Sequence, residues 1–165
     1  MGEKELSFWH NLTEGHEKAK TVWEDVVYEI QKVGREDILN NPAVLDIGGG
    51  MGEFYKYLNQ QGIRSISLDN QDLTVDKEAN PVRASAYQMP FADASFDIVH
   101  GRGVFDDSLY PHDFPKLLTE IARVLKPHGI LSVFDFTPPP TSEFEKLFKR
   151  LSKTDKDYPT LWEKK

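Results

Sequence analysis

The stretch Val44-Leu45-Asp46-Ile47-Gly48-Gly49-Gly50-Met51-Gly52-Glu53-Phe54 decides the fold of this chain. An apolar run passes into four glycines and an amphipathic segment follows directly, which is the pattern of a strand, a tight turn and a helix. Glycine permits positive φ and lets a ligand lie against the backbone, because it has no Cβ. The start of the following helix directs backbone N–H groups at the same space. The stretch therefore predicts a pocket for a small ligand that is partly anionic or carries a carboxylate.

The spacing of the glycines indicates the kind of ligand. A dinucleotide-binding loop follows G-x-G-x-x-G, whereas here glycines stand at 48, 50 and 52, and Glu53 occupies the place of the third fingerprint glycine. A glutamate there would lie near a pyrophosphate, which disfavours a nicotinamide-dependent oxidoreductase. A strand-to-helix turn that binds no ligand has the same pattern and stays open as an alternative.

Three further segments match a known family in order and spacing. Ile66–Asp69 predicts a short strand ending in an acid that can accept ribose hydroxyls, as in dinucleotide folds. Met89–Val99 (MPFADASFDIV) resembles an "LPF–x–SFD–V" signature, and Glu120–Leu131 (EIARVLKPHGIL) resembles an "E–RVLKPGG–L" passage with His128 in place of glycine. With the G-x-G-x-G loop, residues 43–136 resemble the class I S-adenosylmethionine (SAM) methyltransferases of the type-11 family.

This resemblance implies SAM as cofactor, S-adenosylhomocysteine (SAH) as product, and a set of binding residues. The glycines approach the methionine part, Asp46 orients the loop or meets the amino group through water, and Asp69 takes the ribose diol. Ser85 stands where the family often has an acid beside the adenine, so it can accept a hydrogen bond but carries no charge. The implied cofactor-binding residues are Asp46, Gly48, Gly49, Gly50, Gly52, Asp69, Asn70, Ser85, Ala86, Gly101 and Arg102.

The catalytic residue is left open. Methyl transfer from a sulfonium is an in-line displacement for which a protein mainly supplies proximity and orientation, and a general base helps only a hydroxyl or a protonated amine. The sequence does not choose among the candidates near the expected place, His100, Asp106, Asp107 and Tyr110. No Asn/Asp-Pro-Pro-aromatic motif follows the fourth strand, which disfavours methylation of nucleobase or glutamine amides. The histidines lack metal-ligand spacing, so no metal site is expected.

Composition bounds the class of protein. One domain is expected over residues 1–165, and 39% hydrophobic residues suit a globular protein. A net charge of −7, from 20 basic and 27 acidic residues, argues against general nucleic-acid binding. The absence of cysteine excludes disulfides and thiol chemistry. No apolar run reaches membrane-spanning length and no signal peptide is evident, so a cytoplasmic protein without membrane contact is expected.

The predicted fold is α/β, a Rossmann-like doubly wound parallel sheet in the order about 3-2-1-4-5. A helical N-terminal extension covers 1–40, the cofactor-binding core 43–136, and a C-terminal helix and tail 141–165. The strands are expected near 43–47, 65–68, 82–84, 96–100 and 130–136, and the helices near 53–61 and from 113 onward.

The family's C-terminal β-hairpin is expected to be missing. Phe144, Leu147, Phe148 and Leu151 form a helical stripe, and residues 153–165 show no strand pair. The chain is thus interpreted as a minimal, C-terminally short version. The outer edge of the fifth strand would then be open, and either the tail or a second copy in a homodimer would cover it.

Two functions from different classes follow. The first is SAM-dependent methyl transfer to a small-molecule acceptor, favoured by the intact glycine loop and Asp69. The alternative is a degenerate SAM-binding protein with a regulatory or partner-binding role and no catalysis, favoured by Ser85 and the expected loss of the hairpin. Fold alone does not separate them.

Overall fold

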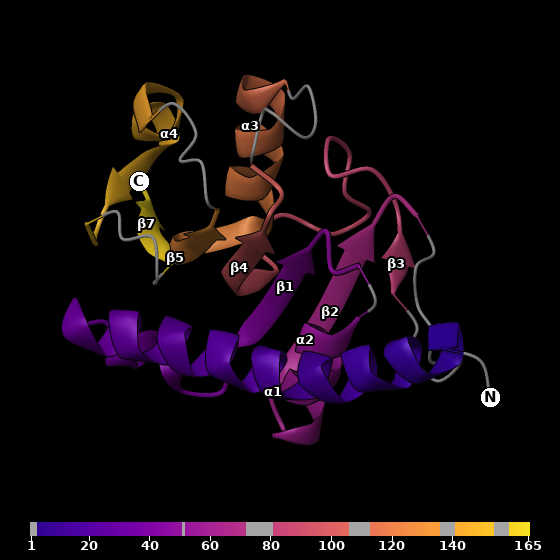
Figure 1. The fold of residues 1–165 in the computed structure, drawn as a ribbon. Helices are drawn as coiled ribbons and strands as arrows, with labels where there is room; N and C mark the ends of the chain where they lie inside the picture. Colours follow the sequence, from indigo (N-terminus) through magenta and orange to yellow (C-terminus); the bar gives the residue numbers. More distant parts are fainter. Residues whose placement is uncertain (1–2, 51, 72–80, 106–112, 136–140, 154–158) are drawn as a thin grey trace.

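The computed structural model describes residues 3–50, 52–71, 81–105, 113–135, 141–153 and 159–165, with the backbone course alone for 3–14. Its middle layer is one sheet, which in the described residues has seven strands in the order β3-β2-β1-β4-β5-β7-β6 (Figure 1). The strands are β1 (Ala43–Ile47), β2 (Arg64–Asp69), β3 (Val82–Arg83), β4 (Phe96–Arg102), β5 (Leu125–Phe134), β6 (Phe148–Arg150) and β7 (Thr160–Lys164). The first five pair in parallel and in the expected order.

The expectation of a missing hairpin is wrong. β7 pairs antiparallel with β5, Leu131 opposite Trp162, and β6 pairs antiparallel with β7. β7 is not evident from the sequence for a physical reason. Leu161 packs on one face of the sheet and Trp162 on the other, so the strand is buried on both sides and does not alternate. Because β7 covers the outer edge of β5, that edge is closed and the suggested homodimer through it loses its basis.

The stripe at Phe144–Leu151 also misled the assignment of the helix that precedes the hairpin. The helix α4 (Thr141–Leu147) ends at Leu147, and Phe148 begins β6 directly. Phe144 in the helix and Phe148 in the strand are both fully buried. Their spacing of four residues therefore does not mark one continuous helix, because each side chain enters the core from a different element. β5 likewise begins at Leu125 rather than at Ile130, with a shift in its pairing to β4 between Phe96 and Ile98.

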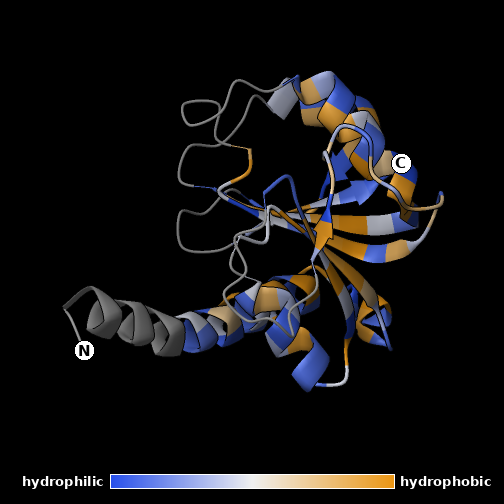
Figure 2. Ribbon diagram, turned by 90° about the vertical axis from the view of Figure 1, so that its right-hand side faces the viewer, coloured by the Kyte–Doolittle hydropathy of each residue, from blue (hydrophilic) through white to orange (hydrophobic). Residues whose placement is uncertain are grey.

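Helices cover both faces of the sheet (Figure 2). On one face lie α1 (Glu3–Lys32) and α2 (Glu53–Gln60). The short helix η1 (Glu36–Leu39) follows α1, and the glycine loop precedes α2. α1 buries Ala19, Trp23, Val26 and Ile30 at helical spacing against Val44 and Ile98. On the other face α3 (Phe114–Val124) and α4 pack on Leu45, Val99 and Leu131. Consecutive strand residues therefore enter opposite cores, as buried parallel strands do.

The two family signatures in the sequence bind each other. The Arg123 guanidinium on α3 donates to the carbonyl oxygens of Met89 at 3.0 Å and Phe91 at 2.8 Å. Glu120, one turn earlier, accepts the Met89 N–H at 2.8 Å and pairs with Arg123. Asp97 accepts the Ala43 N–H at 2.8 Å and binds Lys126 at 2.9 Å. These signature residues thus fix the segment between β3 and β4 rather than carry chemistry.

Candidate cofactor-binding site

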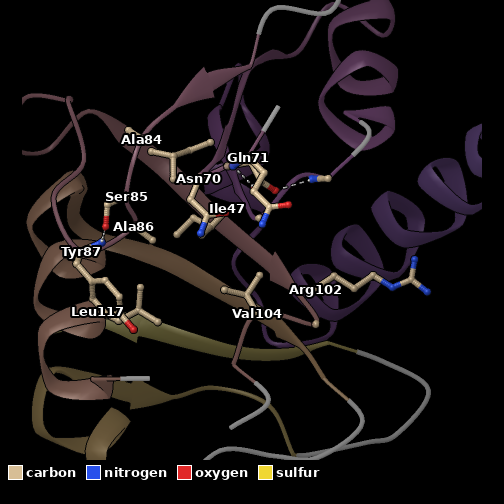
Figure 3. A pocket seen from close by; sticks show the side chains of 15 residues that line it. Ile47, Asn70, Gln71, Ala84, Ser85, Ala86, Tyr87, Arg102, Val104 and Leu117 are labelled. Carbon is tan, nitrogen blue, oxygen red and sulfur yellow. Dashed lines mark hydrogen bonds between the residues drawn. The ribbon is translucent and has the colours of Figure 1, made fainter. Parts of the chain in front are cut away.

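A cavity of about 350 Å³ opens over the carboxyl ends of β1, β2 and β4, where ligands of open α/β sheets lie. Figure 3 shows Ser85, Ala86, Tyr87 and Leu117 together on one side, Asn70 and Gln71 near the centre beside Ile47, and Arg102 on the other side. The remaining lining residues are Ile47, Gly48, Gly50, Leu68, Asp69, Ala84, Arg102, Gly103 and Val104.

The glycine loop forms one wall of this cavity. Gly48 and Gly50 have φ of 66° and 53°, values that favour glycine. The Gly48 N–H donates to Leu68 O at 2.7 Å, so the loop is tied to β2. A Cβ on Gly48 would lie 2.6 Å from a Val104 methyl, whereas a Cβ on Gly50 would meet nothing. The loop therefore needs glycine at 48 for two reasons, conformation and space.

Asp69 joins the loop to the end of β2 and lines the cavity. One carboxylate oxygen accepts the Gly50 N–H at 3.1 Å and the other accepts the Gln71 N–H at 2.9 Å. Each carboxylate oxygen can accept two hydrogen bonds, so capacity for two hydroxyl groups remains. Asp69 therefore both holds the loop and presents an acceptor to a ligand.

Ser85 lies in the segment after β3 that forms one wall of the first cavity. Its hydroxyl oxygen accepts the Tyr87 N–H at 3.1 Å in a local turn, and the Tyr87 phenol oxygen accepts the Asp113 N–H at 3.2 Å. Asp113 in turn caps α3 by accepting the Lys116 N–H. The wall is thereby anchored to the start of α3, which keeps Ala86 and Tyr87 at the cavity.

A second cavity of about 230 Å³ lies on the α1 side of the glycine loop. It shares Gly48 and Arg102 with the first cavity, so the two meet at these residues. Figure 3 shows the Arg102 side chain extending away from the other residues of the first cavity. The other lining residues are Gly15, Lys18, Ala19, Val22, Asp46, Gly49, Glu53, Phe54 and His100.

Two acids of the second cavity are electrostatically unusual. Burial, and secondarily the charge of Asp69, raises the pKa of the Asp46 carboxyl to about 8. Burial also raises the pKa of Glu53, against the effect of Lys18 and His16. Among the described residues, Asp46 Oδ2 and Glu53 Oε1 are both buried and have no hydrogen-bond partner. Such groups favour their neutral form or a nearby cation.

His100 is a neutral imidazole. Burial, and then the charge of Arg102, lowers the pKa of His100 to about 3. Its Nδ1 lies 3.0 Å from Ser132 Oγ, and its ring packs on Phe54 with centroids 4.7 Å apart. A general base should have a pKa near the operating pH, so His100 is poorly suited to accept a proton from an acceptor. Asp106, Asp107 and Tyr110 lie outside the described residues.

Most of the residues expected at the cofactor come together here. The first cavity is lined by Gly48, Gly50, Asp69, Asn70, Ser85, Ala86 and Arg102, and the second adds Asp46 and Gly49. Gly52 and Gly101 line neither cavity. Gly52 has φ of 81° and precedes α2, and a Cβ on Gly101 would lie 2.6 Å from the Phe105 ring. Gly52 thus serves the turn into α2 and Gly101 makes room for the Phe105 ring, and a direct contact of either with the cofactor stays a prediction.

Sequence reasoning missed several lining residues. Tyr87 and Gln71 follow directly on expected positions and Val104 comes two residues after Arg102, and all three line the first cavity. Lys18 and Val22 line the second cavity because this part of α1 packs beside the glycine loop. Their spacing of four predicts a shared helix face, but not what that face meets.

Two features are absent from the residues that the structure describes. No helix there combines the length and apolar composition needed to cross a bilayer. No three His, Asp or Glu side chains in that part of the chain lie together as a metal site would require.

Comparison with known proteins gives the class. The sequence model of a family described as "Methyltransferase domain" matches residues 45–133, which is more than half of the chain. The chain therefore belongs to this family, the type-11 class I SAM-dependent methyltransferases, as the motifs predicted. SAM is the cofactor of the family.

Particular relatives agree with this class. The chain is 31% identical over 134 residues to the demethylmenaquinone methyltransferase of Corynebacterium glutamicum, covering 76% of this chain and 55% of that protein. It is 42% identical over 110 residues to the phthiotriol/phenolphthiotriol dimycocerosates methyltransferase of Mycobacterium leprae, covering 61% of this chain and 40% of that protein. The chain thus spans about half the length of these curated relatives.

Solved structures support the fold alone. A SAM-dependent methyltransferase from Aquifex aeolicus superposes with a TM-score of 0.59 at 21% identity, covering 90% of this chain and 97% of that one. A protein from Pyrococcus horikoshii OT3 superposes with a TM-score of 0.62 at 16% identity, covering 87% and 91%.

Proposed function

We propose that this chain binds SAM across the two joined cavities and transfers its methyl group to a small-molecule acceptor. The observation that carries the proposal is the first cavity, where Gly48, Asp69 and Ser85 converge at the carboxyl edge of the sheet. These positions come from three separate segments of the chain, the glycine loop, the end of β2 and the segment after β3.

The first cavity suits the adenosine end. Ile47, Leu68 and Leu117 offer an apolar surface for a flat base. Asp69 retains acceptor capacity for both ribose hydroxyls, in the manner of acids at the end of a second parallel strand. The Ser85 oxygen accepts the Tyr87 N–H, which leaves the hydroxyl hydrogen as a possible donor to a ligand.

The second cavity suits the amino-acid end. It carries basic side chains, Lys18 and Arg102, for a carboxylate, and the buried Oδ2 atom of Asp46 has no hydrogen-bond partner among the described residues. Gly48 at the junction of the cavities has no side chain that would separate the two ends of the cofactor.

The chain's own contribution to the reaction is orientation. When bound, SAM supplies a methyl group on a positively charged sulfur, which an acceptor atom with a lone pair can take up in line. Holding cofactor and acceptor together is the main demand of such a displacement. His100, neutral and bound to Ser132, keeps the floor of the second cavity fixed without supplying a charge.

A small-molecule acceptor is favoured by the acidic chain and by the named relatives. Their names give demethylmenaquinone and phthiotriol or phenolphthiotriol dimycocerosates as acceptors, while a net charge of −7 opposes a nucleic-acid substrate. The second candidate, a SAM-binding protein without catalysis, is favoured by Ser85 in place of an acid. The hairpin no longer supports that candidate, since β6 and β7 are present.

Titration calorimetry with SAM, SAH and NAD tests the proposal. We expect SAM and SAH to bind and NAD not to bind. Asp69→Asn keeps the shape but removes the charge, and hydrogen bonds to a charged acceptor are worth about 1.5–3 kcal/mol, so affinity should fall by about tenfold or more. Asp113→Asn is the matched control, because asparagine also caps a helix and Asp113 lines neither cavity.

The outcomes separate the candidates. Binding of NAD in preference to SAH, or equal SAH affinity in both variants, would refute the assignment. SAH formation from SAM with a panel of small acceptors then distinguishes an enzyme from a protein that only binds. SAM binding without turnover on any acceptor would favour the non-catalytic role.

A further inference from the structure

The junction of the two cavities carries one charged side chain. Among the described residues, Gly48 and Arg102 are the two that line both cavities. The sulfur of SAM joins the adenosine part to the amino-acid part, so a cofactor that spans both cavities has its sulfur and its methyl group at this junction. An acceptor must therefore approach the methyl group beside Arg102.

The guanidinium group of Arg102 lies on the β5 side of the junction. Its Cζ atom is 5.4 Å from the centroid of the Phe134 ring, and the two residues are paired across β4 and β5. Figure 3 shows the Arg102 side chain leading away from the other residues of the first cavity. Phe134 is half-buried and lines neither cavity, while Arg102 is exposed. The ring thus holds an exposed cation beside the cofactor site.

The charge of Arg102 is not neutralised by an acid in the part of the chain that the structure describes. Asp69 shares the first cavity, but its carboxylate accepts two backbone N–H groups. Asp135 follows Phe134 and accepts the Phe105 N–H at 3.2 Å. Neither acid forms an ion pair with Arg102. A guanidinium group beside a sulfonium repels it, unless an anion lies close to both.

We propose that Arg102 binds the methyl acceptor, and that the acceptor is a small molecule with a carboxylate close to the atom that is methylated. The inference rests on the proposed function and deepens it. Arginine suits this role, because its planar fork binds a carboxylate through two parallel hydrogen bonds. The carboxylate would lie between the guanidinium and the sulfonium and so relieve their repulsion. Lys18, on the α1 side, then serves the carboxylate of the cofactor.

Benzoate and benzamide test this subsite, because they share a shape and differ in charge. Ligand-observed NMR titrations of the SAH complex give the two affinities. Hydrogen bonds to a charged group are the strong ones, so wild type should bind benzoate at least about tenfold more tightly than benzamide. Arg102→Gln should lose this preference. Its affinity for SAH should stay within about twofold of wild type, as for a surface change without a ligand contact.

Arg150→Gln is the matched control. Arg150 also places its guanidinium over an aromatic ring, with Cζ 5.7 Å from the centroid of Trp162, and it lines neither cavity. The substitution removes the same charge from the protein. It should keep the wild-type preference for benzoate.

Three results would overturn the proposal. The first is a wild-type SAH complex without a preference for benzoate, including one that binds neither compound. The second is an unchanged preference in Arg102→Gln, or an equal loss in Arg150→Gln. The third is a tenfold fall in the SAH affinity of Arg102→Gln, which would assign the guanidinium to the cofactor's own carboxylate. Absence of SAH binding by wild type would instead refute the proposed function.

Discussion

Replacing Arg123 by lysine tests whether the contacts of Arg123 hold the two signature segments, 89–99 and 120–131, together; we call this set of contacts the latch. The guanidinium donates to Met89 O and Phe91 O, pairs with Glu120 and also reaches Asp93 at 2.8 Å. Lysine keeps the charge but has a single compact donor group, which cannot span all four partners. The latch should therefore open while the net charge of the protein is unchanged.

The expected loss of unfolding free energy in Arg123→Lys depends on how exposed each partner of Arg123 is. The Asp93 side chain is 79% exposed, so its ion pair contributes little. The two carbonyl bonds involve a charged donor, worth about 1.5–3 kcal/mol each when buried, but the Arg123 side chain is 30% exposed. With lysine retaining one bond, we expect a loss of about 2 kcal/mol in unfolding free energy, and Tm should fall by roughly 4–8 °C for a chain of this size.

Urea unfolding followed by circular dichroism measures this loss. Arg64→Lys is the control, because Arg64 makes one bond of 3.4 Å to Asn41 O on the exposed surface, and such changes cost within about 0.5 kcal/mol. Equal stability of the two variants would refute the latch. The signature would then have to act at the site itself.

Three more changes test single features. His128→Gly relieves a positive φ of 60°, which stabilises the fold by about 1–2 kcal/mol, while the looser unfolded chain costs about 0.4–1 kcal/mol. Urea unfolding should therefore show a higher unfolding free energy. A lower value would mean that the contacts of His128 outweigh the strain. Gly48→Ala should lower SAH affinity more than Gly50→Ala, because only Gly48 faces Val104; equal calorimetric affinities would contradict this. Deleting residues 148–165 should cause aggregation by opening the β5 edge, and a monomeric, folded product in size-exclusion chromatography would show the hairpin to be dispensable.

The parts of the fold that could be predicted are those whose elements carry a clear local pattern, such as an apolar stripe, a helix cap or a glycine turn. α3 carries a strong stripe and an Asp113 cap, and β1 leads into glycines that need positive φ, so both were located closely. The hairpin was missed because β6 has three residues and β7 is buried on both faces. Neither strand has the alternation that identifies a half-buried strand.

The candidate site divides in a similar way. Positions fixed by backbone geometry, such as Gly48 and Asp69, could be predicted from strand ends. Lys18 and Val22 could not, because they depend on where a long helix crosses the sheet. Gly101 shows the same limit, since its missing side chain makes room for the Phe105 ring, a neighbour that the sequence does not indicate. Local spacing does not reveal which neighbour a glycine accommodates.

The most direct test of the account is a crystal structure of the protein in complex with SAH. The account predicts the ribose hydroxyls on the Asp69 carboxylate, the adenine beside Ser85 and Ala86, and the amino-acid end in the second cavity with its ammonium group toward Asp46. SAH bound away from Asp69, or with its adenine in the α1-side cavity, would contradict the central claim that the glycine loop and the end of β2 form the cofactor site.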